Sequence, residues 1–194
     1  LWVLTQRAVA WKSRDRLRIK GDKIEIYNKE GHLEEMKAEG KPATIRKMLP
    51  DSTLIDYNSE SLKVHYLPAQ SLLTLTENAV AWQPSEQLRV KGDQIDIFFQ
   101  EDSRVKKMTS YGRPTRIKKL SLVDGQEEFR SKSLQADYFP GQLFLLSKSA
   151  VVWKSDGTYV GEKIEYDLET KIAKAVGEPK SKKRVRVILQ PQIK

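Results

Sequence analysis

Apolar and polar residues alternate with a period of two along most of this chain. Ile24 and Ile26 are separated by a charged residue, and Leu62, Val64 and Tyr66 alternate with polar neighbours. Strict alternation places one face of a strand on a core and the other in water, which is typical of antiparallel sheets. Turn-forming sequences recur about every 8–12 residues, so the pattern predicts roughly 16–19 short strands in an all-β sandwich or jelly roll.

An internal repeat organises these predicted strands. The block Leu-Thr/Ser-x-x-Ala-Val-x-Trp occurs three times and ends at Trp11, Trp82 and Trp153, which are spaced by 71 residues. Each copy is followed by Gly-Asp/Glu-x-Ile and then by Gly-x-Pro, and a Ser-x-x-x-x-Tyr block ends at Tyr66 and again at Tyr138. Several blocks in one constant order indicate tandem copies of one strand group.

The repeat predicts a single domain over residues 1–194, with copies at roughly 1–49, 50–120 and 121–194. Stacked strand groups form an elongated body with a row of unpaired backbone groups at each end. The first copy begins within a unit, because the Ser-x-x-x-x-Tyr block expected before Leu4 is missing. We therefore expect the native protein to extend N-terminally by at least one or two strands, and the sequence leaves open whether a signal peptide or a membrane anchor lies there.

Composition excludes several classes of site. Cysteine is absent, which excludes disulfide scaffolds, thiolate nucleophiles and cysteine-based zinc sites, and the two histidines, His32 and His65, lie far apart in sequence. No nucleotide-binding or hydrolase motif is present, and no apolar run approaches the ~18 residues of a membrane-spanning helix. His65 alternates with Val64 and Tyr66, so we expect it to face water. The sequence predicts neither an enzyme nor a metal or other cofactor.

The charge balance introduces an alternative function. Lys plus Arg total 35 and Asp plus Glu total 26, which gives a net charge of +9. A basic all-β domain can bind nucleic acid. However, basic residues alternate with acidic ones in most predicted strands, and no aromatic platform is interleaved with them. An anionic amphiphile suits the same charge equally well.

The repeated blocks resemble a known family. Gly40-Lys41-Pro42 with the following Ala-Thr-Ile, residues 61–66, residues 75–79 and residues 91–95 are similar in order and spacing to the OstA-like lipopolysaccharide transport proteins, whose soluble periplasmic branch is LptA. Residues 183–189 resemble the last strand of that branch. The resemblance implies an elongated open β-jelly roll, with two antiparallel sheets in a V and an apolar groove between them. It also implies that lipopolysaccharide acyl chains travel along this groove, with no chemical step.

The resemblance has one departure. This chain shows nearly three units where about two are typical of the LptA branch. The membrane-anchored LptC and the N-terminal domain of LptD share the fold, so a relative of either is an alternative to an LptA-like protein.

The resemblance and the alternation together give a set of candidate groove residues. Motif position in the family implies Ile45, Tyr66, Ile117 and Tyr138, and alternation adds Val64, Leu73, Leu75, Val80, Trp82, Ile95, Ile97, Leu146, Val151, Trp153, Ile164 and Tyr166. The same residues would also serve as the core of a closed sandwich, and the sequence leaves that alternative open. Nearby basic residues are candidates for contacting lipid phosphates: Arg46, Lys47, Arg116, Lys118 and Lys119.

The implied partners are lipopolysaccharide, other copies of the chain, and the transport proteins LptC and LptD, which the family joins into a bridge between the inner and outer membranes. We expect these protein contacts to form by addition of edge strands. Residues 185–189 are predicted to form the C-terminal edge, and residues 1–10 lie near the N-terminal edge.

Overall fold

The computed structural model describes residues 1–13, 16–48, 55–102, 104–176 and 185–189. Within these residues the chain forms β-strands and two short 3-10 helices. The elements are β1 (Trp2–Lys12), β2 (Leu17–Lys29), β3 (His32–Met48), β4 (Ile55–Leu67), η1 (Pro68–Gln70), β5 (Leu72–Gln83), η2 (Pro84–Glu86), β6 (Leu88–Phe99), β7 (Val105–Leu120), β8 (Glu127–Phe139), β9 (Leu143–Lys154), β10 (Gly157–Asp167), β11 (Ala173–Val176) and β12 (Arg186–Leu189).

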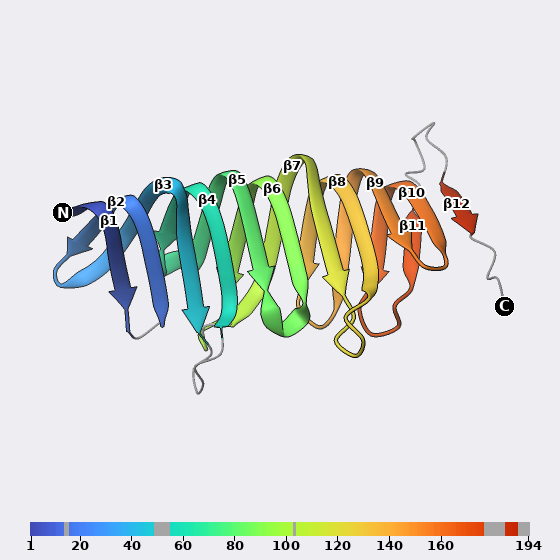
Figure 1. The fold of residues 1–194 in the computed structure, drawn as a ribbon, viewed down its shortest axis with the longest axis horizontal. Coiled ribbons are helices and arrows are strands. Elements are labelled where there is room, and N and C mark those ends of the chain that lie inside the picture. The colour runs from blue at the N-terminus through green and yellow to red at the C-terminus, as the bar shows by residue number, and fades with distance from the viewer. Residues whose placement is uncertain (14–15, 49–54, 103, 177–184, 190–194) are drawn as a thin grey trace.

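The strands form one antiparallel sheet in which neighbours in sequence are neighbours in space. Each strand from β1 to β10 pairs with the next one in the chain, and β12 also pairs with β10. The result is an elongated body with β1 at one end and β10, β11 and β12 at the other (Figure 1). The sheet is open, because β1 does not pair with the far end in the part of the chain that the structure describes.

The strands are fewer and longer than the sequence predicts. The described residues form 12 strands, and β1 to β10 have 11–17 residues each, whereas turn spacing predicts roughly 16–19 short ones. The difference arises at sequences such as Lys20-Gly21-Asp22 and Lys91-Gly92-Asp93, which have turn composition. In the structure they lie within β2 and β6, at register shifts where the strand bends and continues.

The bend is a β-bulge that recurs with the repeat. In β5, pairing is interrupted between Thr76 and Ala79, and the intervening Glu77 and Asn78 have φ values of 64° and 61°. The pairs 6–7 in β1 and 148–149 in β9 have the same left-handed backbone. Each of β1 to β10 has a comparable shift near its middle. Because bulges bend strands, a row of aligned bulges folds the sheet lengthwise.

Small residues make this fold line possible. A Cβ at Gly92 would lie 2.6 Å from the Tyr111 carbonyl oxygen, so only glycine allows β6 and β7 to approach there. The serines of the Ser-x-x-x-x-Tyr blocks satisfy backbone groups at the same line. Ser61 Oγ donates to the Lys63 carbonyl at 2.7 Å, and Ser133 Oγ donates to the Gln135 carbonyl at 2.8 Å.

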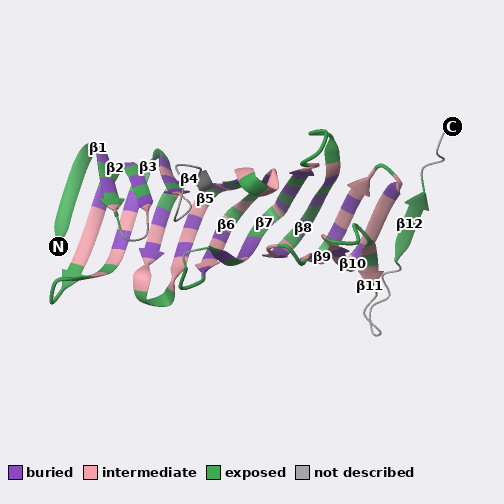
Figure 2. Cartoon of the chain, turned by 90° about the horizontal axis from the view of Figure 1, so that it is seen from below, coloured by how far each residue is buried: buried purple, intermediate pink, exposed green. Residues whose placement is uncertain are grey.

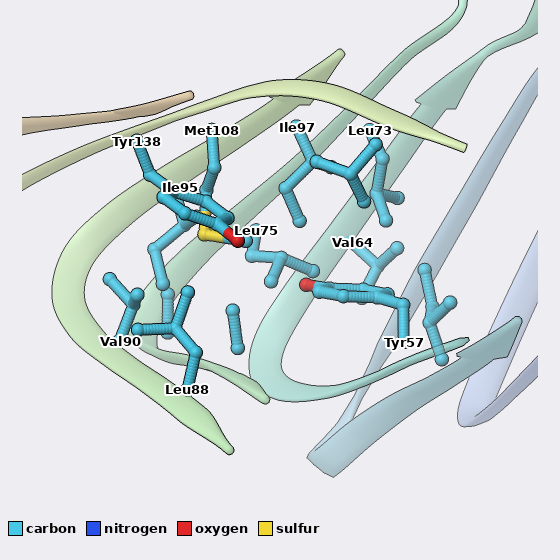
Figure 3. Packing of buried hydrophobic residues seen from close by; sticks show 14 of the residues in the cluster. Tyr57, Val64, Leu73, Leu75, Leu88, Val90, Ile95, Ile97, Met108 and Tyr138 are labelled. Carbon is cyan, nitrogen blue, oxygen red and sulfur yellow. The ribbon is translucent and has the colours of Figure 1, made fainter. Parts of the chain in front are cut away.

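Folding along this line produces two facing layers. Layer 1 contains residues 72–76 of β5 and the strand halves paired with them directly or through neighbours, ending at β11; layer 2 contains residues 79–83 and their paired halves, ending at β12. In Figure 3, Leu88 and Val90 of layer 2 point toward Ile95 and Met108 of layer 1. The core therefore lies between the layers and runs along the whole body.

One long side of the body is closed by the chain and the other is not. At the fold line, each strand from β1 to β10 passes from one layer to the other. At the opposite side, which we call the rim, strand ends are joined within one layer: η1 links β4 to β5 in layer 1, and η2 links β5 to β6 in layer 2. The bends lie along the upper side in Figure 1 and the turns along the lower side. The two layers meet at the rim through side chains.

An aromatic cluster joins the layers near the C-terminal end. Phe129 of layer 2 lies 5.3 Å from the Phe144 ring centroid and 4.3 Å from that of Tyr166, both in layer 1. Tyr138 stacks on Phe144 at 4.6 Å. Such aromatic pairs contribute about 0.5–1.5 kcal/mol each beyond the burial of their area.

Candidate functional site

A continuous apolar interior runs between the layers, and most predicted groove residues lie in it. Each of the following is at most 5% exposed and belongs to the buried core: Ile45, Val64, Tyr66, Leu73, Leu75, Ile95, Ile97, Ile117, Tyr138, Leu146, Ile164 and Tyr166. They come from β3 to β10, so they line the interior over most of its length. The interior is thus long and apolar. It lies between two layers whose backbones are connected along the fold line but not along the rim.

Four predicted groove residues lie elsewhere. Val80, Trp82, Val151 and Trp153 are on the outward face of layer 2, and Trp82 is 46% exposed. After the bulge in β5, the inward positions are taken by Ala79, Ala81 and Gln83, and the alternate residues face out. These four predicted groove residues therefore lie outside the interior, because Ala79 and Ala81 in β5 and Val152 in β9 take the inward positions after the bulge.

Inward-facing lysines close the rim. Lys47 of β3 lies 3.6 Å from the ring centroid of Phe99 in β6. Lys12 of β1 lies 5.4 Å from the ring of Tyr66 in β4. In both pairs the lysine is in layer 2 and the ring is in layer 1, so each pair spans the two layers. We call these contacts the rim pairs. Cation–π contacts of this kind contribute ~0.5–2 kcal/mol, and more when water is excluded.

A third rim pair lies near the C-terminal end. Lys154 of β9 lies 5.7 Å from the ring of Tyr166. Its ammonium also donates to the Lys171 carbonyl at 2.6 Å and to Asp156 at 3.2 Å. Lys12 and Lys154 each follow a repeated Trp directly in sequence. That position is a sequence signal for these two rim lysines, whereas the second copy has Gln83 there and Lys47 follows Arg46.

The predicted phosphate-contacting residues divide between two places. Lys47 and Lys119 face inward at the rim and are only 3% and 6% exposed. Lys119 donates to the Glu86 carbonyl at 2.8 Å and lies 3.7 Å from the Glu86 carboxylate. Arg46, Arg116 and Lys118 take the alternate positions and lie on the outward face of layer 2. The structure therefore does not bring the five residues together at one point.

The outward face of layer 1 carries paired charges. Glu35 lies 3.0 Å from Lys37 and 2.5 Å from His65 Nε2. Burial alone would raise the pKa of Glu35, but the hydrogen bonds and charges of Lys37 and His65 outweigh burial and lower it. On the same face, the Thr109 hydroxyl donates a hydrogen bond to the Asp137 carboxylate at 2.7 Å. His65 thus lies on the outer face, as alternation predicts.

Both ends of the body expose apolar residues. Trp2 and Leu4 of β1 are opposite Ile26 and Ile24, on the side of the interior, yet are 65% and 36% exposed. At the other end, Leu189 of β12 is 71% exposed. Figure 2 shows the first part of β1 and all of β12 as exposed. Residues 185–189 therefore lie at the C-terminal edge, as predicted, and the third Gly-x-Pro block at 177–179 lies outside the described residues.

Other kinds of site are not visible in the described chain. The described residues contain no group of three or more His, Asp or Glu placed to hold a metal ion. Within the same residues, no helix has the length and apolar character required to cross a membrane.

Comparison with known proteins agrees with this architecture. A family model described as "LptA/(LptD N-terminal domain) LPS transport protein" matches residues 12–89 and 86–172. No curated protein sequence matches the chain. The fold is similar to that of LptH, described as the LptA homologous periplasmic component of the conserved lipopolysaccharide transport device from Pseudomonas aeruginosa, with a TM-score of 0.61. The identity is 20%, over 70% of this chain and 95% of that chain. The predicted all-β open jelly roll is confirmed.

Proposed function

Because this chain belongs to the family of LptA and LptD N-terminal lipopolysaccharide transport proteins, we propose that it holds lipopolysaccharide acyl chains between its two layers and passes them along its length. The proposed location is the periplasm, as part of a bridge between the inner and outer membranes. The observation that supports this proposal best is the continuous apolar interior, which backbone closes along the fold line and only side chains close along the rim. The family and the fold are those of transport proteins rather than enzymes.

The energetics suit transport. Burying one acyl methylene contributes ~0.8 kcal/mol, so ten methylenes contribute roughly 8 kcal/mol per chain before the cost of ordering. Apolar residues from β3 to β10 provide this environment repeatedly, so no single position needs to bind strongly. The side chains that fill the interior without lipid must give way when acyl chains enter. The layers separate most easily at the rim, where they meet without backbone connections.

We propose that lysines of the rim bind the lipid headgroup when lipid enters between the layers. When the layers part, Lys47 leaves the face of Phe99 and its ammonium becomes available to an anion at the mouth. A phosphate on the lipid headgroup would then replace the ring as the partner of the lysine, through a charge-assisted hydrogen bond. We propose the same role for Lys119, which exchanges its contacts with Glu86. Arg46, Arg116 and Lys118 would meet headgroup phosphates that extend around the rim.

Native mass spectrometry of the full chain with lipid A tests this function. We expect protein–lipid adducts that persist at high salt, since apolar burial is not screened by ions whereas phosphate contacts are. Lys47→Met keeps a similar side-chain length and removes the charge, so it should weaken lipid A binding about tenfold at low salt and much less at high salt. Adducts that are absent, or that disappear entirely with salt, would contradict an acyl-binding interior.

The exposed ends suggest how copies and partners join. We propose that β1 and β12 accept strands from further copies, from LptC and from LptD, which would continue each layer and cover Trp2 and Leu4. Ending the chain after Pro179 removes β12 while leaving β1 to β11. Light scattering over a range of concentrations should then show loss of oligomers. Oligomers of unchanged size would contradict the role of β12.

A further inference from the structure

The outward face of layer 2 carries a regular arrangement of tryptophan and basic side chains. Trp11, Trp82 and Trp153 take equivalent outward positions in β1, β5 and β9. Across the strand pairs, Trp11 is opposite Arg18 and Trp82 is opposite Arg89. Trp11 and Trp82 are 50% and 46% exposed. These outward positions of layer 2 form what we call the outer ladder.

Between Trp82 and Trp153 the outer ladder is almost entirely cationic. Two cross-strand rows span β6, β7 and β8, and they consist of Arg89, Lys118 and Arg130 in one row and Lys91, Arg116 and Lys132 in the other. Among the described residues, the carboxylate of Glu127 is the one that ion-pairs with these rows, 3.5 Å from Lys118 and 3.6 Å from Arg130. Two of the six cations, Lys118 and Arg130, thus share one carboxylate partner.

The outward face of layer 1 differs in how its charges are paired. On layer 1, cations have carboxylate neighbours: Lys23 lies 2.6 Å from Glu25, and Lys107 lies 2.8 Å from Asp137. A protein that needs only a soluble surface keeps charges of both signs interspersed. The unneutralised rows on layer 2 therefore indicate a surface that meets an anion.

The outer ladder is also hollowed beside its tryptophans. A hollow of about 630 Å³ is lined by the six basic residues and Trp153, together with Ile117, Glu127 and Ser131. A second of about 310 Å³ lies beside Trp82 and Arg89, and Arg46 and Glu60 also line it. Both volumes fall in the range of ~300–1,000 Å³ that holds small organic ligands. The Arg130 guanidinium and the Lys132 ammonium lie 5.4 Å and 5.6 Å from the Trp153 ring, which combines an aromatic surface with two cations.

The outer ladder begins where a headgroup would leave the interior. Each tryptophan is the next-to-last residue of its strand, and the last residues are Lys12, Gln83 and Lys154, which turn toward the interior at the rim. A molecule with acyl chains between the layers must pass these residues to reach solvent. The first surface that it meets outside layer 2 is the row that contains the tryptophans.

We propose that the outer ladder binds the phosphorylated saccharide of the lipid whose acyl chains lie between the layers, an inference that rests on the proposed function. Phosphates pair with the arginines, whose planar guanidinium groups suit bidentate contacts. The apolar faces of sugar rings stack on the tryptophans. Nucleic acid suits the arrangement less well. Proteins that bind single strands place aromatic residues for successive bases, whereas these tryptophans lie four strands apart, about 19 Å at ~4.8 Å per strand.

The test uses a probe without acyl chains. Fully deacylated, phosphorylated lipopolysaccharide is titrated into the full chain, and binding is followed by tryptophan fluorescence and calorimetry. The double variant Arg130→Gln, Lys132→Gln should weaken binding at least tenfold, and Trp153→Ala should weaken it several-fold. The matched control is Lys23→Gln, Lys107→Gln, which removes the same charge from layer 1 and should leave binding unchanged. All these side chains lie outside the core, so the variants should fold.

The outcomes separate this proposal from the proposed function. Binding of the deacylated probe that only the outer-ladder variants lose supports the inference. If lipid A binds but the deacylated probe does not, the outer ladder is not a saccharide site and the acyl-binding interior stands. If neither binds, both proposals fail. Equal loss in the layer 1 control, or stronger binding to single-stranded DNA or to anionic phospholipid vesicles than to the probe, would also overturn the saccharide assignment.

Discussion

Replacing Phe129 with alanine tests whether acyl chains can occupy the space between the layers. Phe129 is fully buried, packs on Phe144 and Tyr166 across the interior, and is the layer 2 member of the aromatic cluster. Removing a buried phenyl ring costs about 3–5 kcal/mol, which includes the lost contacts and the cavity left behind. For a chain of this size, each kcal/mol shifts the melting temperature by about 2–4 °C. Phe129→Ala without lipid should therefore melt roughly 6–20 °C lower than the wild type.

Lipid should reverse part of this loss. About four acyl methylenes occupy a space like that of the missing ring, and at ~0.8 kcal/mol each they return roughly 3 kcal/mol. Because a ligand stabilises the folded state according to its affinity, Phe129→Ala should bind lipid A more tightly than the wild type, by up to about 100-fold. The assay is thermal unfolding at a series of lipid A concentrations, with the shift of each variant compared with its own lipid-free value.

Phe139→Ala is the matched control. Phe139 follows Tyr138 on the opposite, outward face of β8, with Lys107 5.3 Å from its ring. This variant should lose less stability and show the same lipid-induced shift as the wild type. If lipid A stabilises Phe129→Ala no more than it stabilises Phe139→Ala, acyl chains do not lie beside the aromatic cluster, and the interior is a closed core at that point.

Three further changes test the strand facing, the fold line and the charges of layer 1. Tyr66→Asp should abolish lipid A adducts in native mass spectrometry, whereas His65→Asp on the outward face of β4 should keep them; the reverse would contradict the assigned facing. Gly92→Ala should lower the free energy of unfolding in urea by about 1–3 kcal/mol, since its Cβ would lie 2.6 Å from the Tyr111 carbonyl oxygen, and an unchanged midpoint would refute the need for glycine. The pKa of Glu35 lies below its ordinary value of 4.5, so Glu35 stabilises the fold above that pH and this contribution is lost as the pH falls through the lower folded pKa. Unfolding in urea between about pH 5 and pH 3 should therefore show a smaller loss of stability for Glu35→Gln than for the wild type.

Much of the interior was predictable from alternation alone. Leu75 lies between two threonines and Ile95 lies between Gln94 and Asp96, and a strand can satisfy that pattern only by burying one face. Trp82 was predicted to lie in the groove, whereas the structure places it on the outward face of layer 2, where it is 46% exposed. A tryptophan can instead lie half-exposed beside arginine, where the ring covers the aliphatic stem and contacts the cation. Ala79 and Ala81 take the inward positions after the bulge, which leaves Trp82 on the outward face.

The bends and the rim pairs were less accessible to sequence reasoning. Gly-Asp composition at positions 21–22 and 92–93 is typical of a turn, and only pairing with both neighbouring strands shows that the chain bends and continues there. The contact between Lys47 and Phe99 joins β3 to β6, strands that are not paired with each other. It depends on how far one layer is displaced along the other when the sheet folds, and no local pattern encodes that displacement.

Under the proposed function, the repeat also determines whether the chain itself can set a direction of transport. Equivalent bulges at residues 6–7, 77–78 and 148–149 recur every four strands, so the interior offers similar environments at steps of about 19 Å. Similar environments bind with similar free energy, and a lipid moving from one to the next gains nothing on average. The chain by itself therefore sets no direction of transport. What it would supply is a low barrier between steps, because under both proposals the acyl chains would stay between the layers and the saccharide would stay on the outer ladder throughout. Direction must then come from loading at one exposed end and removal at the other. Additional copies would lengthen the path without adding a free-energy difference along it.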